Sequence, residues 1–292
     1  MTLQNRNWII FLLAIVLLSG CSAFKKEEDP TATAEEMYAA AKKSLGKKNW
    51  NTAVEQLRKL EAKYPYGVYA EQAQIDTIYA YYRNSETGLA VAAADRFIRL
   101  HPTHPSVDYA YYLKGLSSYQ EKDSTIGRLA GKDDLSDRDA NLTRNALNAF
   151  KDVHTLFPES RYAADSRARS RYLYDALARH ELAVASYYLS RDAYVAVVNR
   201  AKGVIENYDS TPSVETALAM LVFSYRQMGL NDLSDDAIRI LKLNYPESRN
   251  LGENGRVRIG DKWYSPDSSG KGEKKRGFFS SIFKKPEKKP SS

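Results

Sequence analysis

The sequence predicts an all-α protein, a superhelix of about five helix–turn–helix units with a disordered N-terminal linker and a disordered C-terminal tail. Four prolines follow an aromatic residue or a histidine, and a small residue stands twelve positions before each proline. The first two small residues and the first two prolines are both 37 residues apart, and apolar residues recur between these anchors at helical spacing. The dipeptides are Tyr64-Pro65, His101-Pro102, Phe157-Pro158 and Tyr245-Pro246, and the small residues are Ala53, Ala90, Ala146 and Ser234.

Each anchored segment is expected to be the second helix of a pair, because another helical stretch precedes it. The proline after it cannot continue the helix and redirects the chain. The expected first helices are about Ala34–Leu45, Ala70–Tyr82, Asp108–Gln120 and Val214–Met228. A further, irregular unit pairs a long helix, about Tyr162–Leu189, with a helix at about Ala193–Tyr208, and ends in Tyr208-Asp209.

The unit, about 34 to 37 residues long, resembles a tetratricopeptide repeat. Its first copy carries Trp50, Ala53, Leu57, Leu60 and Pro65 in the order of that repeat. A generic helical bundle is the alternative. Stacked pairs would form a concave groove that receives peptides or partner domains.

The N-terminus reads as a lipoprotein signal peptide over residues 1–20. Arg6 precedes an apolar run, Trp8 to Leu18, which is shorter than the roughly 20 residues that span a bilayer. The run ends in Leu18-Ser19-Gly20-Cys21, which resembles a lipobox, with Cys21 as the lipidated residue. An ordinary signal peptide with a chance cysteine is the alternative. Cys21 is the only cysteine, so the chain has no internal disulfide.

The predicted domain organisation continues with a flexible tether (21–33), a repeat scaffold (34–250) and a basic, mostly disordered tail (251–292). Ser22, where inner-membrane lipoproteins carry Asp, favours lipid anchoring at the periplasmic face of the outer membrane. Eight basic and two acidic residues from Lys271 onward account for +6 of the net charge of +7, so no nucleic-acid-binding face is expected. The tail segment Arg276–Lys285 contains Phe278 and Phe279, and three interpretations stay open: contact with anionic lipid, docking into a partner, or a solubilising tail.

No motif predicts catalysis, and neither a metal nor a cofactor is expected. His101 and His104 have a spacing that would allow a metal pair, but flanking prolines and the lack of a nearby carboxylate or cysteine cluster favour a rigid turn. The segment from Asp137 begins like a calcium loop but has Leu142 and Asn148 where Gly and Glu are required, which predicts a solvated loop.

Runs outside the repeat pattern resemble the BamD family, the tetratricopeptide-repeat lipoproteins of the outer-membrane β-barrel assembly machinery. These runs are Asn49-Trp50, Tyr64–Gly67, Ile78–Tyr82, Asp95–Pro105, Ser136–Asp139, Ala193–Arg200 and Ala217–Met228. The tail beyond Asn250 is not covered by the resemblance.

The resemblance implies a non-enzymatic scaffold that docks on the periplasmic POTRA region of BamA and works with other lipoproteins of the assembly complex. It implies a BamA contact at Arg200, with Asn199 and Tyr194 beside it; an ordinary surface arginine is the alternative. It also implies that unfolded outer-membrane proteins bind a groove near the N-terminus, which involves Tyr64, Tyr66, Tyr69, Tyr79 and Tyr82. The alternative function is a cell-wall or division-linked periplasmic adaptor, which the Ser136–Asp139 and Ala193–Arg200 runs disfavour.

Overall fold

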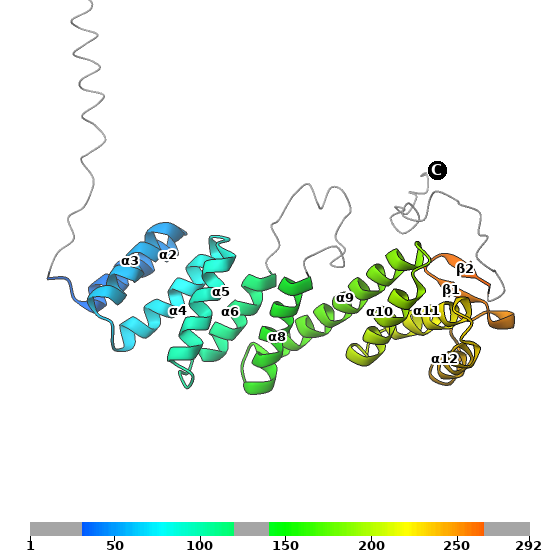
Figure 1. Ribbon diagram of the computed structural model, residues 1–292. Coiled ribbons are helices and arrows are strands. Elements are labelled where there is room, and N and C mark those ends of the chain that lie inside the picture. Colours follow the sequence, from blue (N-terminus) through cyan, green and yellow to red (C-terminus); the bar gives the residue numbers. More distant parts are fainter. Residues whose placement is uncertain (1–30, 120–139, 266–292) are drawn as a thin grey trace, which may run out of the picture. The chain divides into compact units, whose positions relative to one another are not determined.

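A computed structural model describes residues 31–119 and 140–265, and these residues form helix–turn–helix pairs (Figure 1). The all-α repeat fold predicted from the sequence is confirmed, and the helices begin and end within two residues of the expected positions. The chain divides into two compact units, Met1–Ala73 and Gln74–Ser292, each considered by itself. The helices are α2 (Ala34–Gly46), α3 (Trp50–Lys63), α4 (Val68–Arg83), α5 (Thr87–Leu100), α6 (Val107–Tyr119), α8 (Ala140–Leu156), α9 (Ala163–Leu189), α10 (Tyr194–Asn207), α11 (Ser213–Gln227) and α12 (Asn231–Asn244).

The first unit is built on the pair α2 and α3. Thr33 caps α2 through a capping box: its hydroxyl accepts a hydrogen bond from the Glu36 backbone N–H, and the Glu36 carboxylate accepts one from the Thr33 N–H. Apolar side chains on one face of each helix are buried, with Ala41 and Leu45 on α2 and the anchor Ala53 on α3. The small anchor lets the two helices approach closely, as the sequence predicted.

Four of the described turns between paired helices share the same backbone conformation. The residue two positions before the second helix has a φ of 60° at Lys48, 60° at Ser85, 58° at Asp192 and 75° at Gly229. The residue that follows has an N-cap φ between −84° and −89° in all four turns. Three of the four positions hold a side chain in the left-handed region that favours glycine. The turn geometry is therefore a property of the repeat rather than of glycine.

The end of each second helix also repeats. Tyr64, His101, Tyr208 and Tyr245 have φ between −128° and −138°, and each donates its backbone N–H to the carbonyl four residues earlier. Tyr208 adopts this conformation although Asp209, not proline, follows it. The aromatic residue or histidine is thus the common feature of the helix end. The small anchors Ala53, Ala90, Ala146 and Ser234 are fully buried, and Val197 takes the same position in α10.

In the second unit each helix from α5 to α12 packs on the next one described. Helix α11 is the most deeply buried, with every residue from Ala217 to Tyr225 inside the core. Helices α9, α10 and α12 contact it, and so does a short hairpin of β1 (Val257–Ile259) and β2 (Lys262–Tyr264). Figure 1 shows this hairpin beside α11.

The hairpin corrects the expected tail. Residues 251–265 were expected to belong to a mostly disordered segment, but Val257 and Ile259 are buried against α11, and the Tyr264 ring lies 4.7 Å from that of Phe223. Strands of three residues are too short to give a period-two pattern that the sequence could reveal. Residues 266–292, which include Phe278 and Phe279, lie outside the described residues, as do Cys21 and the loop around Asp137.

Within the described ranges, no helix combines the length and the apolar character needed to cross a membrane.

Candidate partner-binding groove

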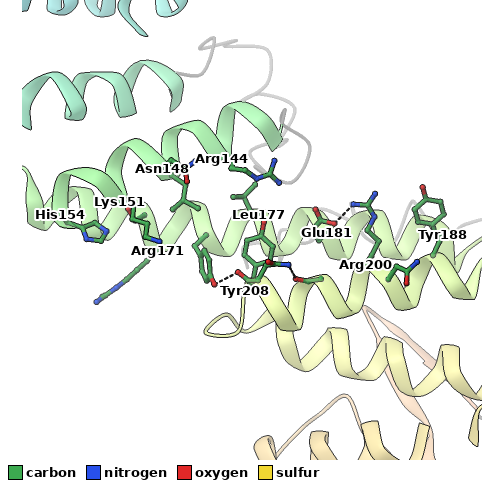
Figure 2. A pocket seen from close by; sticks show the side chains of 17 residues that line it. Arg144, Asn148, Lys151, His154, Arg171, Leu177, Glu181, Tyr188, Arg200 and Tyr208 are labelled. Atoms are coloured by element: carbon green, nitrogen blue, oxygen red, sulfur yellow. Dashed lines mark hydrogen bonds and ion pairs between the residues drawn. The ribbon is translucent and has the colours of Figure 1, made fainter. Parts of the chain in front are cut away.

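Three consecutive helices of the second unit, α8, α9 and α10, enclose a groove of about 1020 Å³ (Figure 2). Each helix contributes one face, with residues spaced three, four or seven apart. The lining residues are Arg144, Leu147, Asn148, Lys151 and His154 from α8, Ser170, Arg171, Tyr174, Leu177, Glu181 and Tyr188 from α9, and Ala196, Asn199, Arg200, Gly203, Asn207 and Tyr208 from α10 and its end.

Small residues on α10 keep the groove open. Ala196 and Gly203 lie seven residues apart and therefore on the same face of the helix. A Cβ added at Gly203 would meet no atom within 4 Å, so no neighbouring side chain or helix requires glycine there. Glycine inside a helix is less favourable than alanine by about 1 kcal/mol. Neither helix stability nor packing therefore requires glycine at position 203. The missing side chain leaves the groove wider at this point.

Arg200 lies on the α10 side of this groove and pairs with Glu181 on α9. Its Nη1 donates to Glu181 Oε2 at 2.9 Å. The Arg200 side chain is 45% exposed and that of Glu181 only 18%. The hydrogen bond to Glu181 raises the pKa of the Arg200 guanidinium above its ordinary value. Tyr188, also on α9, interacts with the same guanidinium, so α9 holds one side of Arg200 while about half of its side chain stays exposed.

The groove is basic. Arg144, Lys151, Arg171 and Arg200 line it, and Glu181 is the one carboxylate among the lining residues. His154 adds no charge at neutral pH, because burial and the neighbouring Arg167 lower the pKa of its imidazole. Leu147, Leu177 and the rings of Tyr174 and Tyr208 supply an apolar surface between the charged groups. The combination suits a chain that carries both acidic and apolar side chains.

The structure places two of the three predicted BamA-contact residues in this groove. Asn199 and Arg200 both line it. Tyr194 lines a neighbouring hollow, which Asn199 also borders together with Met228. The Tyr194 hydroxyl donates to Asp192 Oδ1 at 2.9 Å; burial, and then this bond, raise the pKa of Tyr194 to about 12. Tyr194 therefore joins the turn residue Asp192 to the start of α10.

The tyrosines predicted to form the substrate groove have different environments. In the first unit, the Tyr64 hydroxyl donates to the Ala32 carbonyl at 2.9 Å, and the Tyr69 ring lies 5.6 Å from that of Tyr38. Tyr66 is 91% exposed. Tyr64 and Tyr69 are therefore engaged in contacts within the first unit, whereas Tyr66 is exposed to solvent.

In the second unit, Tyr79 and Tyr82 pack against the core cluster that includes Ile78 and Phe97. The Tyr79 hydroxyl accepts a hydrogen bond from Arg83 Nη1 at 2.7 Å. These two tyrosines are therefore partly committed to the packing of α4 on α5.

The two turn histidines pack as part of the inter-repeat turn. His101 Nε2 lies 3.1 Å from Gln74 Oε1, and His104 Nδ1 accepts a hydrogen bond from the Ser106 N–H at 3.0 Å. Both rings contact Phe97, at centroid distances of 5.0 and 5.3 Å. No cluster of three His, Cys, Asp or Glu side chains suited to a metal ion occurs in the described parts of the chain.

Sequence reasoning missed the cations on α8 and α9, the carboxylate Glu181 and the open Gly203. Arg144 and Lys151 are seven residues apart, so a helical pattern puts them on one face, but many solvated helix faces share that pattern. Only the packing of α8, α9 and α10 brings them opposite Arg200.

Comparison with known proteins decides the family. Residues 30–240 match the model of YfiO, described as an outer membrane lipoprotein. The chain belongs to the YfiO family of outer membrane lipoproteins. The match covers the helices that build the groove, α8, α9 and α10, and both sets of tyrosines.

Relatives within the YfiO family are named outer membrane protein assembly factor BamD. The protein from Neisseria meningitidis serogroup A is 44% identical over 73% of this chain and 80% of its own length. The protein from Xylella fastidiosa strain Temecula1 is 37% identical over 82% of this chain and 81% of its own. That from Vibrio cholerae is 35% identical over 80% of this chain and 96% of its own. The hairpin beyond Asn250 lies outside the residues that match the family.

Proposed function

We propose that the protein is a non-enzymatic scaffold lipoprotein of the outer-membrane β-barrel assembly machinery. It docks on the periplasmic POTRA region of BamA and receives unfolded barrel proteins for folding and insertion. The observation that carries the proposal is the position of Arg200: it lines a basic groove beside Asn199, and its side chain is half-exposed while it pairs with Glu181. Relatives at up to 44% identity are named as assembly factors, which supports the same role here.

The chemistry of Arg200 suits a docking contact. A guanidinium is planar and presents several N–H donors in a fork, which matches a carboxylate with two parallel hydrogen bonds. Glu181 takes one terminal nitrogen of this fork, Nη1, in the free protein. A carboxylate on BamA would complete the set, and Asn199 beside it would add an amide donor and acceptor.

We further propose that unfolded substrates contact the N-terminal tyrosines. Among the described residues, Tyr66 has the most exposed of the large apolar side chains. Its ring can contact the aromatic side chains of an unfolded substrate while its hydroxyl remains hydrated. Tyr64, Tyr69, Tyr79 and Tyr82 are partly buried and would shape the surface rather than bind directly.

Cys21 is proposed as the lipid attachment site, with the protein held at the periplasmic face of the outer membrane. The first described helix begins at Ala34, and Thr33 caps it, while the Ala32 carbonyl accepts hydrogen bonds from Lys63 and Tyr64. We therefore propose that the tether after Cys21 ends before Ala32 and not at residue 33. Anchored there, the scaffold would also meet the other lipoproteins of the assembly complex.

Purification of the membrane complex through a tag on this protein tests the proposal. The expected result is recovery of BamA and of the other assembly lipoproteins in constant ratio. Recovery of cell-wall or division proteins without BamA would contradict it and support the adaptor alternative. Mass spectrometry of the N-terminal peptide in the same preparation would show acyl chains on Cys21, or a free thiol if the anchor assignment is wrong.

A further inference from the structure

We propose that residues 276–285 of the basic tail dock on the exposed side of α12 and cover the last helix of the repeat stack. The docking surface is the α12 stripe, which consists of Leu233, Ile240 and Leu243. The tail segment supplies four large apolar side chains between basic residues. The inference goes beyond the proposed function and does not rest on it, because the proposed BamA contact lies on α10.

Helix α12 exposes more large apolar side chains than any other helix of the described residues. Leu233 is 46% exposed, Ile240 42% and Leu243 80%. Ile240 follows Leu233 by seven residues and Leu243 follows by three more, so the three lie on one side of the helix. A different side is already used for packing, because Ser234, Ala237 and Leu241 are buried. The α12 stripe is therefore a second apolar side of the same helix.

The position of α12 in the stack explains why its apolar side needs a cover. Inside the stack each helix packs on the next one, whereas no α-helix follows α12 in the described residues. The last repeat of a stacked protein ordinarily has a polar outer face, because an uncovered apolar face lowers solubility. The α12 stripe departs from this rule, so an occupant is expected there.

Residues 276–285 match the α12 stripe in composition. Their apolar residues stand at positions i, i+1, i+4 and i+5, and in a helical conformation this spacing places all four on one side. These residues are Phe278, Phe279, Ile282 and Phe283. Lysines and an arginine precede and follow them. A segment of this kind can lay its apolar side along an apolar helix while its basic residues stay in water.

Charge favours the same pairing. Four acidic and two basic residues lie between Asn231 and Glu247, so α12 and its end carry a net negative charge. Asp236 lies three residues after Leu233 and four before Ile240, which puts a carboxylate on the side that holds the α12 stripe. The side chain of Asp236 is 58% exposed. From residue 271 onward the tail carries +6, so the two surfaces attract each other.

The tail starts close enough to α12 for this contact. The ring of Tyr264 in β2 lies 4.7 Å from that of Phe223 in α11, and α12 also packs on α11 (Figure 1). Phe278 is the thirteenth residue after Ser265, so the chain between them can span up to about 43 Å. Helix α12, with 14 residues, is only about 21 Å long. Every part of the α12 stripe is therefore within reach.

Docking within the chain accounts for two features together. A lipid surface would give the apolar residues of the tail a place and leave the α12 stripe uncovered. A second copy seated on α12 would cover the α12 stripe and leave the tail unused. The tether favours the intramolecular contact further, because a short linker gives the tail segment an effective concentration in the millimolar range at α12. Lipid and a second copy are outcomes of the test.

Disulfide cross-linking of the full-length protein in outer membranes tests the proposal. One cysteine pair is Asn244→Cys with Ser281→Cys, since residue 244 is exposed and lies one turn after Ile240 on the same side of α12. The matched control pair is Lys242→Cys with Ser281→Cys, which moves the first cysteine to another exposed side of α12. We expect the first pair to form an intrachain disulfide at least about tenfold faster. Equal rates for the two pairs would overturn the proposal.

Substitutions on both surfaces locate the contact. In the first cysteine pair, the double variant Ile240→Gln and Leu243→Gln is expected to lower the cross-linking rate to that of the control pair, because the apolar contact is lost. Phe279→Gln with Phe283→Gln in the tail should have the same effect. Leu89→Gln, 51% exposed on α5, is the matched control and should leave the rate unchanged. Circular dichroism confirms that each variant keeps its helices. An unchanged rate in both double variants would overturn the proposal.

The same experiment distinguishes the other occupants. The membrane is present during the reaction, so a tail segment that prefers lipid would give equally slow rates for both cysteine pairs and overturn the proposal. A disulfide between two chains, recognised as a product of twice the mass, would assign the α12 stripe to a second copy and overturn it as well. A fast intrachain disulfide in the first pair alone, lost in both double variants, would support docking of the tail on α12.

Discussion

Gly115 of α6 lies against the ring of Phe150 of α8, and a Cβ at position 115 would stand 2.7 Å from Phe150 Cε1. Phe150 is fully buried and packs with Ala146 and Leu173, so its ring has little room to move. The close approach of α6 to α8 therefore depends on a glycine in the middle of a helix.

Gly115→Ala is expected to destabilise the second unit by about 1–3 kcal/mol, because the added methyl group overpacks the contact with Phe150. Urea unfolding followed by circular dichroism measures the change. The control is Gly203→Ala, also inside a helix but facing open space, which should stabilise the protein by up to about 1 kcal/mol. A rise in stability for both variants would show that α6 and α8 are not in close contact.

Gly229→Ala is expected to cost about 1–2 kcal/mol, since Gly229 has a φ of 75° and alanine is strained in this region. Lys48→Ala, at the equivalent turn position with a φ of 60°, exchanges one Cβ-bearing residue for another and should change stability by less than about 0.5 kcal/mol. The midpoints of thermal unfolding compare the two. Equal effects would mean that the shared turn conformation is wrong.

The hairpin that covers α11 is expected to be part of the folded core. Ile259→Ala should cost about 2–4 kcal/mol because Ile259 is buried, whereas Arg258→Ala, between the two buried positions, should cost little. Two truncations give a second measurement. Ending the chain after Asn250 should lower the unfolding midpoint below that of a chain that ends after Ser265. Identical midpoints for the two truncations would contradict a hairpin that is packed on α11.

Tyr194 is expected to ionise only in strongly alkaline solution, because burial and the bond to Asp192 raise its pKa to about 12. The raised value means that the protonated phenol is favoured in the folded state. Its contribution to stability is present below the unfolded pKa of about 10 and is lost as the pH rises to about 12. Spectrophotometric titration of the parent protein and of Tyr194→Phe compares their tyrosine ionisation. The variant should lack one phenol that ionises near pH 12 in the parent. Removal of a group near pH 10 instead would contradict the bond to Asp192.

The sequence predicted the repeat well because each unit repeats the same physical requirements. A small residue must sit where two helices approach, and an aromatic residue or histidine must end the second helix, so Ala53 and Tyr64 recur as Ala90 and His101. Even the irregular unit fits, with Val197 at the anchor position.

The groove and the hairpin were not predictable in the same way. Arg200 was identified through its family resemblance, but its partner Glu181 is nineteen residues away on another helix, and no local pattern joins them. Lys151 and Arg171 resemble ordinary solvated residues until the helices are packed. Val257 and Ile259 form a pattern too short to recognise without α11 beneath them.

The measurement that tests the central claim most directly is the recovery of BamA through tagged Arg200→Gln protein. Arg239→Gln is the matched control, since Arg239 is 77% exposed on α12 and also pairs with a single carboxylate, that of Asp236. We expect Arg200→Gln to reduce BamA recovery about tenfold or more while circular dichroism and the recovery with Arg239→Gln stay unchanged. Full recovery of BamA with Arg200→Gln would contradict docking through this residue.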